Sequence, residues 1–345
     1  MFPNKKLFKE TPKIKLSKNQ IKEIDELKNQ IKHNKFSYET VSCGCCNSEN
    51  KIILSKYDRY GIPYKSNLCR NCGLIYTSPR FNQKSYIEFY DNQYRKIYTT
   101  TQTQSPEEFF KSQQNQGEKI FKYIKENFKL KIDSVLEIGC GMGGILYHFK
   151  KNDCKVLGVD FGRRYIEQGK NYNLNLQLGG INDIHNERFD LIIYSHVFEH
   201  ILDLDFELIQ IKERLNLNGI LYIEVPGVLN LKENYRSDLN RYFQNAHTYN
   251  FTLKTLSNIL HKHGFELISG NEKVESIYKI SSNNNPKTLN DYNRIIKKIK
   301  VYEFERKTWI FSVKGLKTIL VGLLMQINLY NVVKKIHKQV TSCLL

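Results

Sequence analysis

Hydrophobic positions recur along this chain with two different periods, and these periods predict most of its elements. Ile21, Ile24 and Leu27 repeat at helical spacing, which predicts an amphipathic helix from Ser17 to Asn34 with Ser17 as its N-cap. From residue 117 onward, short apolar runs of strand length alternate with helix-length segments. Such alternation is typical of a parallel sheet with helices on both faces, so the predicted class is α/β with a Rossmann-like, doubly wound sheet.

The expected elements of this sheet follow one another in regular order. The expected strands are Ser134–Ile138, Lys155–Val159, Leu174–Leu178, Phe189–Tyr194, Gly219–Val225 and Phe265–Ile268. The expected helices are Glu118–Asn127, Gly144–Lys151, Arg164–Asn171, Asp205–Leu215 and Thr252–His263.

Five segments of different composition divide the chain. We expect a basic helical segment over 1–40, a cysteine-rich unit over 41–80, a connector over 81–116, the α/β domain over 117–270 and a basic helical segment over 271–345. The connector is polar, rich in glutamine and aromatic residues, and is expected to be helical with a loose stretch near 99–105.

Charge is concentrated at the two ends of the chain. The formal net charge is +18, with ten lysines against five acidic residues in 1–40 and fourteen Lys or Arg against five acidic residues in 271–345. A basic chain suits an anionic partner such as nucleic acid, an anionic membrane surface or a phosphorylated substrate, while solubilising lysines are an equally good explanation. Because the excess positive charge lies at the two ends of the chain, it gives only weak support to a nucleic-acid groove in the α/β domain.

The first ten residues lack the apolar region of a signal peptide, and no run of 18 apolar residues follows. We therefore expect a cytoplasmic protein. The segment Trp309 to Lys338 mixes Leu, Ile and Val with lysines. It is expected to pack on the core as a helix or, alternatively, to lie on the anionic inner face of a membrane as a peripheral contact.

Five of the eight cysteines lie within residues 43–72. Cys43 and Cys46 form one C-x-x-C pair and Cys69 and Cys72 another, with 22 residues between the pairs. Two such knuckles supply four thiolates to a tetrahedral zinc ion, so a closed, structural zinc ribbon is predicted. Cys45 is a possible substitute for Cys46, and reduced cysteines buried in a core are the alternative to a metal site. Gly73 follows the second pair, where a positive φ is expected.

A glycine-rich turn follows the first strand of the α/β domain in the sequence Val135-Leu136-Glu137-Ile138-Gly139-Cys140-Gly141-Met142-Gly143-Gly144. Glycines are needed where a strand turns sharply into a helix and a ligand touches the backbone. Asp160 ends the next strand, where a carboxylate accepts hydrogen bonds from ribose hydroxyls. These features fit a dinucleotide and S-adenosylmethionine equally well. Glu137 favours the latter, because an acidic residue suits a cationic sulfonium better than a pyrophosphate.

These motifs, with Gly158-Val159-Asp160, Phe189-Asp190-Leu191-Ile192-Ile193 and the Gly219-to-Pro226 segment, resemble those of class I S-adenosylmethionine-dependent methyltransferases from Gly117 to Ser269. The resemblance implies that the Gly139–Gly141 backbone holds the methionine part, that Asp160 binds the ribose and that the Gly180–Asp183 loop passes the adenine. The residues expected at the cofactor are Glu137, Gly139, Cys140, Gly141, Asp160, Phe161, Ile181, Asp183 and Ser195.

Candidate catalytic residues follow the fourth strand of the sheet. Ligands of such folds lie at the carboxyl ends of the strands, so His196, Glu199 and His200 are expected near the methyl group. His196 is the first candidate for a group facing the acceptor, and contact with the cofactor or a helix cap is its alternative. Glu199 and His200 are a candidate general base pair or metal ligands, with a structural role as the alternative. His247 is expected to overhang the site as a lid residue or to open the following helix.

The cysteine unit resembles the zinc ribbon that precedes some methyltransferases of surface-polysaccharide and nucleotide-sugar pathways, in which Cys-x-x-Cys-Gly is followed by an aromatic residue and Pro79-Arg80. This likeness implies a sugar, nucleotide-sugar or glycan acceptor. Deoxysugar C-methyltransferases of this layout carry Tyr-x-Glu-His, and Tyr242 to His247 lacks that acid. An Asp/Asn-Pro-Pro-Tyr sequence is absent too, so nucleic acid is disfavoured. The alternatives are an RNA methyltransferase and a non-catalytic cofactor-binding scaffold.

Overall fold

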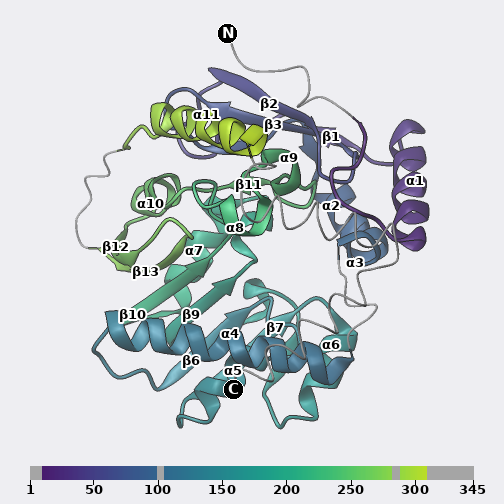
Figure 1. Ribbon diagram of the computed structural model, residues 1–345. Coiled ribbons are helices and arrows are strands. Elements are labelled where there is room, and N and C mark those ends of the chain that lie inside the picture. Colours follow the sequence, from purple (N-terminus) through teal and green to yellow (C-terminus); the bar gives the residue numbers. More distant parts are fainter. Residues whose placement is uncertain (1–9, 99–104, 282–287, 309–345) are drawn as a thin grey trace, which may run out of the picture.

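The computed structural model describes residues 10–98, 105–281 and 288–308 (Figure 1). Its largest element is a seven-stranded sheet in the order β12-β13-β10-β9-β6-β7-β8. The strands are β6 (Ser134–Ile138), β7 (Lys155–Asp160), β8 (Leu176–Leu178), β9 (Phe189–Ser195), β10 (Leu215–Glu224), β12 (Phe265–Gly270) and β13 (Glu275–Ile280). Strands β8, β7, β6, β9 and β10 are mutually parallel, and β13 runs antiparallel between β10 and β12. The strand order reverses between β6 and β9, and folds of this type bind ligands at that point.

Helices cover both faces of the sheet, as the alternating sequence predicts. Alternate residues of each strand point to opposite faces, so β6 sends Val135 into one core and Leu136 into the other. The core of Val135 contains side chains from α4 (Pro106–Asn127), α5 (Gly144–Lys150) and α6 (Arg163–Lys170). The core of Leu136 contains side chains from α7 (Leu204–Arg214) and α10 (Leu253–Lys262). In Figure 1, α4 crosses one face of the sheet over its whole width.

The cysteine-rich unit supplies three of the four strands of a second, antiparallel sheet. Its order is β11-β4-β3-β2, with β2 (Lys51–Tyr57), β3 (Pro63–Cys69), β4 (Ile75–Thr77) and β11 (Tyr249–Asn250). Strand β11 comes from the α/β part of the chain, yet it pairs with β4, so that Tyr249 faces Tyr76. Helix α11 (Tyr292–Thr308) packs on this sheet through Ile295, Ile299 and Tyr302. The cysteine-rich unit is therefore built into the domain rather than attached to it by a linker.

Helices from the N-terminal segment and the connector form a third cluster beside both sheets. They are α1 (Lys18–Lys32), α2 (Gln83–Phe89), the π-helical turn η2 (Tyr90–Tyr94) and α3 (Arg95–Tyr98), next to the short strands β1 (Tyr38–Glu39) and β5 (Arg80–Phe81). Ser17 caps α1 with a complete capping box, which confirms the predicted start of that helix. The remaining short elements are the 3-10 turns η4 (Ile181–Asp183) and η5 (Phe198–His200), and helices α8 (Lys232–Tyr235) and α9 (Leu239–Tyr242).

The structure corrects two sequence predictions. The helix expected from Glu118 begins at Pro106, because Ser105 and Glu108 form a capping box ahead of it. The segment after residue 270 was expected to be helical, but 275–280 is β13, whose Ile277 and Tyr278 are fully buried. Within the residues described, no helix is long and apolar enough to cross a membrane. The expectation for Trp309 to Lys338 lies outside the described residues.

Candidate functional site

The glycine-rich turn stands at the carboxyl edge of the large sheet, where β6 leads into α5. Gly139 and Gly141 have φ values of 70° and 56°, in the left-handed region that favours glycine. The Gly141 N–H donates to Asp160 Oδ2 at 3.0 Å, and the Gly162 N–H donates to Asp160 Oδ1 at 2.6 Å. The structure thus brings the turn and Asp160 together as predicted, with the carboxylate held by backbone amides of two loops.

Arg95 of α3 reaches the same carboxylate, a contact that sequence reasoning missed. Its Nη2 lies 3.4 Å from Asp160 Oδ1, and its guanidinium stacks over the Tyr165 ring at 4.2 Å. The guanidinium also crowds Gly162, because a Cβ there would lie 2.0 Å from Nη2. A ribose bound to Asp160 would therefore have to share the carboxylate with Arg95 or displace it.

In the Gly180–Asp183 loop expected at the adenine, Ile181 is buried and Asn182 and Asp183 are exposed. Ile181 is the buried residue of η4, and Asp183 Oδ2 accepts a hydrogen bond from the Gly180 N–H at 2.8 Å, closing the loop on itself. Phe161 is 80% exposed, and its ring lies over Gly180. An exposed aromatic ring beside a closed loop offers an apolar surface to a flat ligand.

Two predicted cofactor residues are buried, Glu137 in the strand before the turn and Cys140 within the turn. Glu137 is fully buried in β6, and burial raises its pKa well above the ordinary value, with the nearby Asp160 charge adding to the effect. Its Oε2 has no hydrogen-bond partner among the described residues. The Cys140 thiol is also buried, which raises its pKa, and its amide donates to Val159 O at 3.0 Å. A cationic ligand near Glu137 would stabilise the ionised carboxylate.

Glu224, at the end of β10, accepts hydrogen bonds from three polar side chains, and these contacts were not predicted from the sequence. Its Oε2 accepts hydrogen bonds from Gln116 at 2.6 Å, from Ser195 at 3.3 Å and from Tyr222 at 3.4 Å. Ser195, one of the predicted cofactor residues, is therefore oriented by Glu224. The sequence pointed to Glu224 only through its position at the carboxyl end of a predicted strand. Its hydrogen bond with Gln116 was not predictable, because it forms only where α4 crosses the sheet.

His196 follows β9 and stands between two carboxylates. Its Nε2 is 3.8 Å from Glu224 Oε1 and its Nδ1 is 3.9 Å from Glu199 Oε1, while its side chain is 54% exposed. The residue has a φ of 57°, in the left-handed region, which His adopts more readily than most residues other than glycine. An exposed imidazole between two carboxylates is suited to accept a proton from a bound acceptor.

Glu199, His200 and His247 form a buried cluster below His196. Glu199 Oε1 is 3.8 Å from His200 Nε2 and 3.7 Å from His247 Nε2. Burial raises the pKa of Glu199 to about 8, lowers that of His200 to about 4 and lowers that of His247 well below its ordinary value. His247 is only 3% exposed, so the expectation of an overhanging lid residue is wrong. The chain folds the segment around it inward, against the cysteine-rich unit.

That inward position is held by the N-terminal part of the chain. Thr77 of β4 donates its hydroxyl to His247 O at 3.0 Å, and its amide donates to Thr248 O at 2.9 Å. Asp58 Oδ2 accepts from the Asn245 amide and from the Tyr98 hydroxyl, each at 3.1 Å. The cysteine-rich unit and the connector thus set the position of a candidate catalytic histidine.

The four sulfurs of the two C-x-x-C pairs converge as predicted. Sγ of Cys43 is 3.5 Å from that of Cys72, Cys46 and Cys69 are separated by the same distance, and all four sulfurs lie within 4.8 Å of one another. Zinc–sulfur bonds of about 2.3 Å place tetrahedral sulfurs about 3.8 Å apart, so the cluster fits a zinc ion. Cys45 stands outside this group of four. Gly73 has a φ of 88°, which confirms the expected knuckle turn.

A comparison with protein families gives one match. Residues 102–269, just under half of the chain, match the model described as a methyltransferase domain. The described part of this range, residues 105–269, has a Rossmann-like methyltransferase fold. The match begins near the start of α4 and ends in β12, so it covers the glycine turn, Asp160 and the histidine cluster.

Curated relatives match this domain over short stretches. The ubiquinone biosynthesis O-methyltransferase of Coxiella burnetii (strain Dugway 5J108-111) is 33% identical over 90 residues, which are 24% of this chain and 38% of the relative. The ubiquinone biosynthesis O-methyltransferase of Pelagibacter ubique (strain HTCC1062) is 28% identical over 120 residues, 30% of this chain and 50% of the relative. The chain thus spans half or less of the length of these relatives.

Solved structures share the architecture only broadly. The plantazolicin methyltransferase BpumL, solved with a desmethylPZN analog and SAH, is 18% identical and covers 55% of this chain and 78% of its own, with a TM-score of 0.41. An S-adenosylmethionine-dependent methyltransferase from Clostridium acetobutylicum is 15% identical and covers 57% and 99%, with a TM-score of 0.40. Likenesses at this level do not bear on the substrate.

Proposed function

We propose that the protein transfers a methyl group from S-adenosylmethionine to a hydroxyl of a sugar, nucleotide-sugar or glycan. The observation that carries the proposal is the convergence at one edge of the sheet: the Gly139–Gly141 turn, Asp160 and His196 follow three neighbouring parallel strands. The family match over residues 102–269 supports the donor. The O-methyltransferase names of the relatives favour an oxygen acceptor.

In the proposed reaction the acceptor oxygen attacks the methyl carbon in line with the sulfur. An oxygen–carbon bond forms as the carbon–sulfur bond breaks, and the bonding electron pair stays on sulfur to give S-adenosylhomocysteine. The hydroxyl proton passes to His196, whose exposed imidazole lies 3.8 Å from Glu224 Oε1 and 3.9 Å from Glu199 Oε1. Alignment of acceptor, methyl and sulfur supplies much of the remaining rate.

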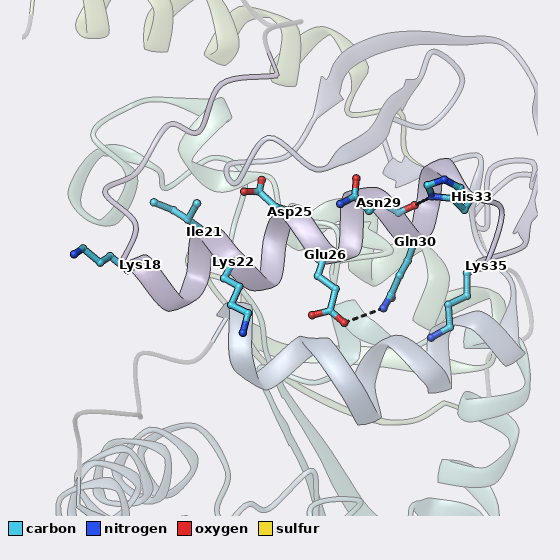
Figure 2. Close-up of a pocket in the computed structure, with 9 residues that line it drawn as sticks. All are labelled: Lys18, Ile21, Lys22, Asp25, Glu26, Asn29, Gln30, His33 and Lys35. Carbon is cyan, nitrogen blue, oxygen red and sulfur yellow. Dashed lines mark hydrogen bonds between the residues drawn. The ribbon is translucent and has the colours of Figure 1, made fainter.

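The sugar class of the acceptor rests on the ribbon layout, and the surface of α1 gives a further reason to prefer it to RNA. Figure 2 shows the shallow pocket along α1, which is lined by Lys18 and Lys22, then by Asp25 and Glu26, and by Lys35 just beyond the end of the helix. Nucleic-acid grips depend on a stripe of one charge sign. The mixed charges on this helix do not provide one.

The proposal is tested with His196→Ala, because this side chain is half exposed and its loss leaves the core intact. Loss of a general base is expected to lower kcat about 10²- to 10⁴-fold, with the Kd for S-adenosylmethionine unchanged in calorimetry. His33→Ala, an exposed histidine at the end of α1, is the matched control and should keep full activity. Equal activity in both variants would remove His196 from the mechanism, and absence of transfer in the unmodified protein would favour a scaffold.

A further inference from the structure

The cluster beneath His196 has the composition of a metal centre. We propose that Glu199, His200 and His247 bind one divalent transition-metal ion, separate from the zinc proposed for the four cysteines. Their ligand atoms, one carboxylate oxygen and two imidazole nitrogens, lie within 4.8 Å of one another. Two histidines and one carboxylate are a common ligand set for Zn²⁺ and related ions, whereas Mg²⁺ prefers oxygen ligands.

The distances fit an ion after a small contraction. Bonds of roughly 2.0–2.2 Å at tetrahedral angles place ligand atoms about 3.3–3.6 Å apart. Glu199 Oε1 is 3.8 Å from His200 Nε2 and 3.7 Å from His247 Nε2. The Gln244 amide contacts the same nitrogen of His247, so it must turn away or present its oxygen to the ion. Shifts of a few tenths of an ångström would bring the two pairs with Glu199 to these distances, and the two histidine nitrogens lie within 4.8 Å of each other.

Contacts behind His200 set which nitrogen faces the cluster. His200 Nδ1 is 2.8 Å from the Ala246 carbonyl oxygen and 2.7 Å from the Tyr90 hydroxyl. With Nδ1–H donated to the carbonyl, Nε2 carries the lone pair and points to Glu199. The Tyr86 hydroxyl donates to the same carbonyl oxygen at 2.7 Å. Metal-binding histidines have this arrangement, in which the second ring nitrogen donates to a carbonyl or carboxylate.

Glu199 is oriented for an additional ligand. Its side chain is 2% exposed, and its Oε2 has no hydrogen-bond partner among the described residues. Its backbone carbonyl is fixed by the amide and hydroxyl of Thr248, at 2.9 and 3.1 Å. A buried carboxylate oxygen without a donor is costly, and a cation is a partner that removes this cost.

His196 is the exposed side chain next to the cluster, with its Nδ1 3.9 Å from Glu199 Oε1, so we infer that an open fourth position lies on its side. Three protein ligands with one open position are typical of catalytic rather than structural metal sites. A hydroxyl bound there becomes more acidic, which would ease its deprotonation by His196. This consequence rests on the proposed methyl transfer, whereas binding of the ion does not.

The test uses Mn²⁺ with full-length protein, because Mn²⁺ has little affinity for thiolate sites and its free ion is observed by electron paramagnetic resonance. We expect one Mn²⁺ per chain, and at least tenfold weaker binding in Glu199→Gln and in His247→Gln. His263→Gln is the matched control, since His263 pairs with Asp205 on the surface at 2.7 Å. Circular dichroism checks that each variant is folded.

Absence of Mn²⁺ binding to the unmodified protein would overturn the proposal whatever the variants do. Equal affinity in the folded Glu199→Gln variant would place the ion elsewhere and also overturn it. Stoichiometric binding in a protein that transfers no methyl group would support the metal site and refute the proposed function, so the two failures are distinguishable.

Discussion

Replacement of Gly139 by alanine tests how closely the glycine turn packs against the loop that carries His196. The left-handed backbone of Gly139, with its φ of 70°, costs an alanine roughly 1–2 kcal/mol. A Cβ at this position would also lie 2.4 Å from Cγ2 of Val197. Overpacking of this kind costs about 1–3 kcal/mol, so the substitution should lower the free energy of unfolding by about 2–5 kcal/mol in total.

The two contributions are separable by a double-mutant cycle. Val197→Ala removes the methyl group that an alanine at 139 would meet, so adding Gly139→Ala to the Val197→Ala variant should cost only the backbone contribution of about 1–2 kcal/mol. The free energy of unfolding of each protein is measured by urea denaturation. We expect a favourable coupling of about 1–3 kcal/mol between the two sites. Additive effects would refute the close approach of the turn to the His196 loop.

Three further predictions concern other parts of the chain. Asp160→Asn should raise the Kd for S-adenosylmethionine about 10- to 100-fold in calorimetry, because hydrogen bonds to charged groups contribute about 1.5–3 kcal/mol, and an unchanged Kd would contradict the ribose assignment. The native protein should contain one zinc ion per chain by elemental analysis. Cys69→Ser should lose both the zinc and the methyl-transfer activity, because the cysteine-rich unit holds His247 in place. Active protein without zinc would contradict the zinc ribbon. Burial raises the pKa of Asp58 to about 6 from 3.8, so this carboxyl binds its proton more tightly in the folded state. Its stabilising contribution is complete below about pH 4 and falls by about 3 kcal/mol as pH rises through 6; a pH-independent difference in unfolding free energy between the unmodified protein and Asp58→Asn would count against this.

Local sequence patterns correctly predicted those helices and strands that are determined by their own side chains. Ser17 caps α1 as expected, and the strands from β6 to β10 lie where apolar runs place them within a few residues. Strand β11 consists of Tyr249 and Asn250 alone, and it is a strand only because β4 lies beside it. Strand β13 was missed because its buried Ile277 and Tyr278 occur in a segment whose lysines favoured a surface helix.

The candidate site was predictable where it follows single strands. The glycine turn, Asp160 and His196 each stand directly after a recognisable strand, so their meeting at one edge follows from parallel topology. Contacts that depend on tertiary packing were not predictable. Arg95 meets Asp160, and Tyr90 meets His200, only because the connector helices fold back over the sheet edge. No periodicity of the polar, aromatic connector indicates this.

Transfer of labelled methyl from S-adenosylmethionine into separated pools of host extract tests the central claim most directly. The assay compares the unmodified protein with His196→Ala on a nucleotide-sugar and glycan pool and on total RNA. The account predicts label in the nucleotide-sugar or glycan pool with the unmodified protein, and at least a hundredfold less with His196→Ala. Label in nuclease-sensitive material, or equal label from both proteins, would contradict it.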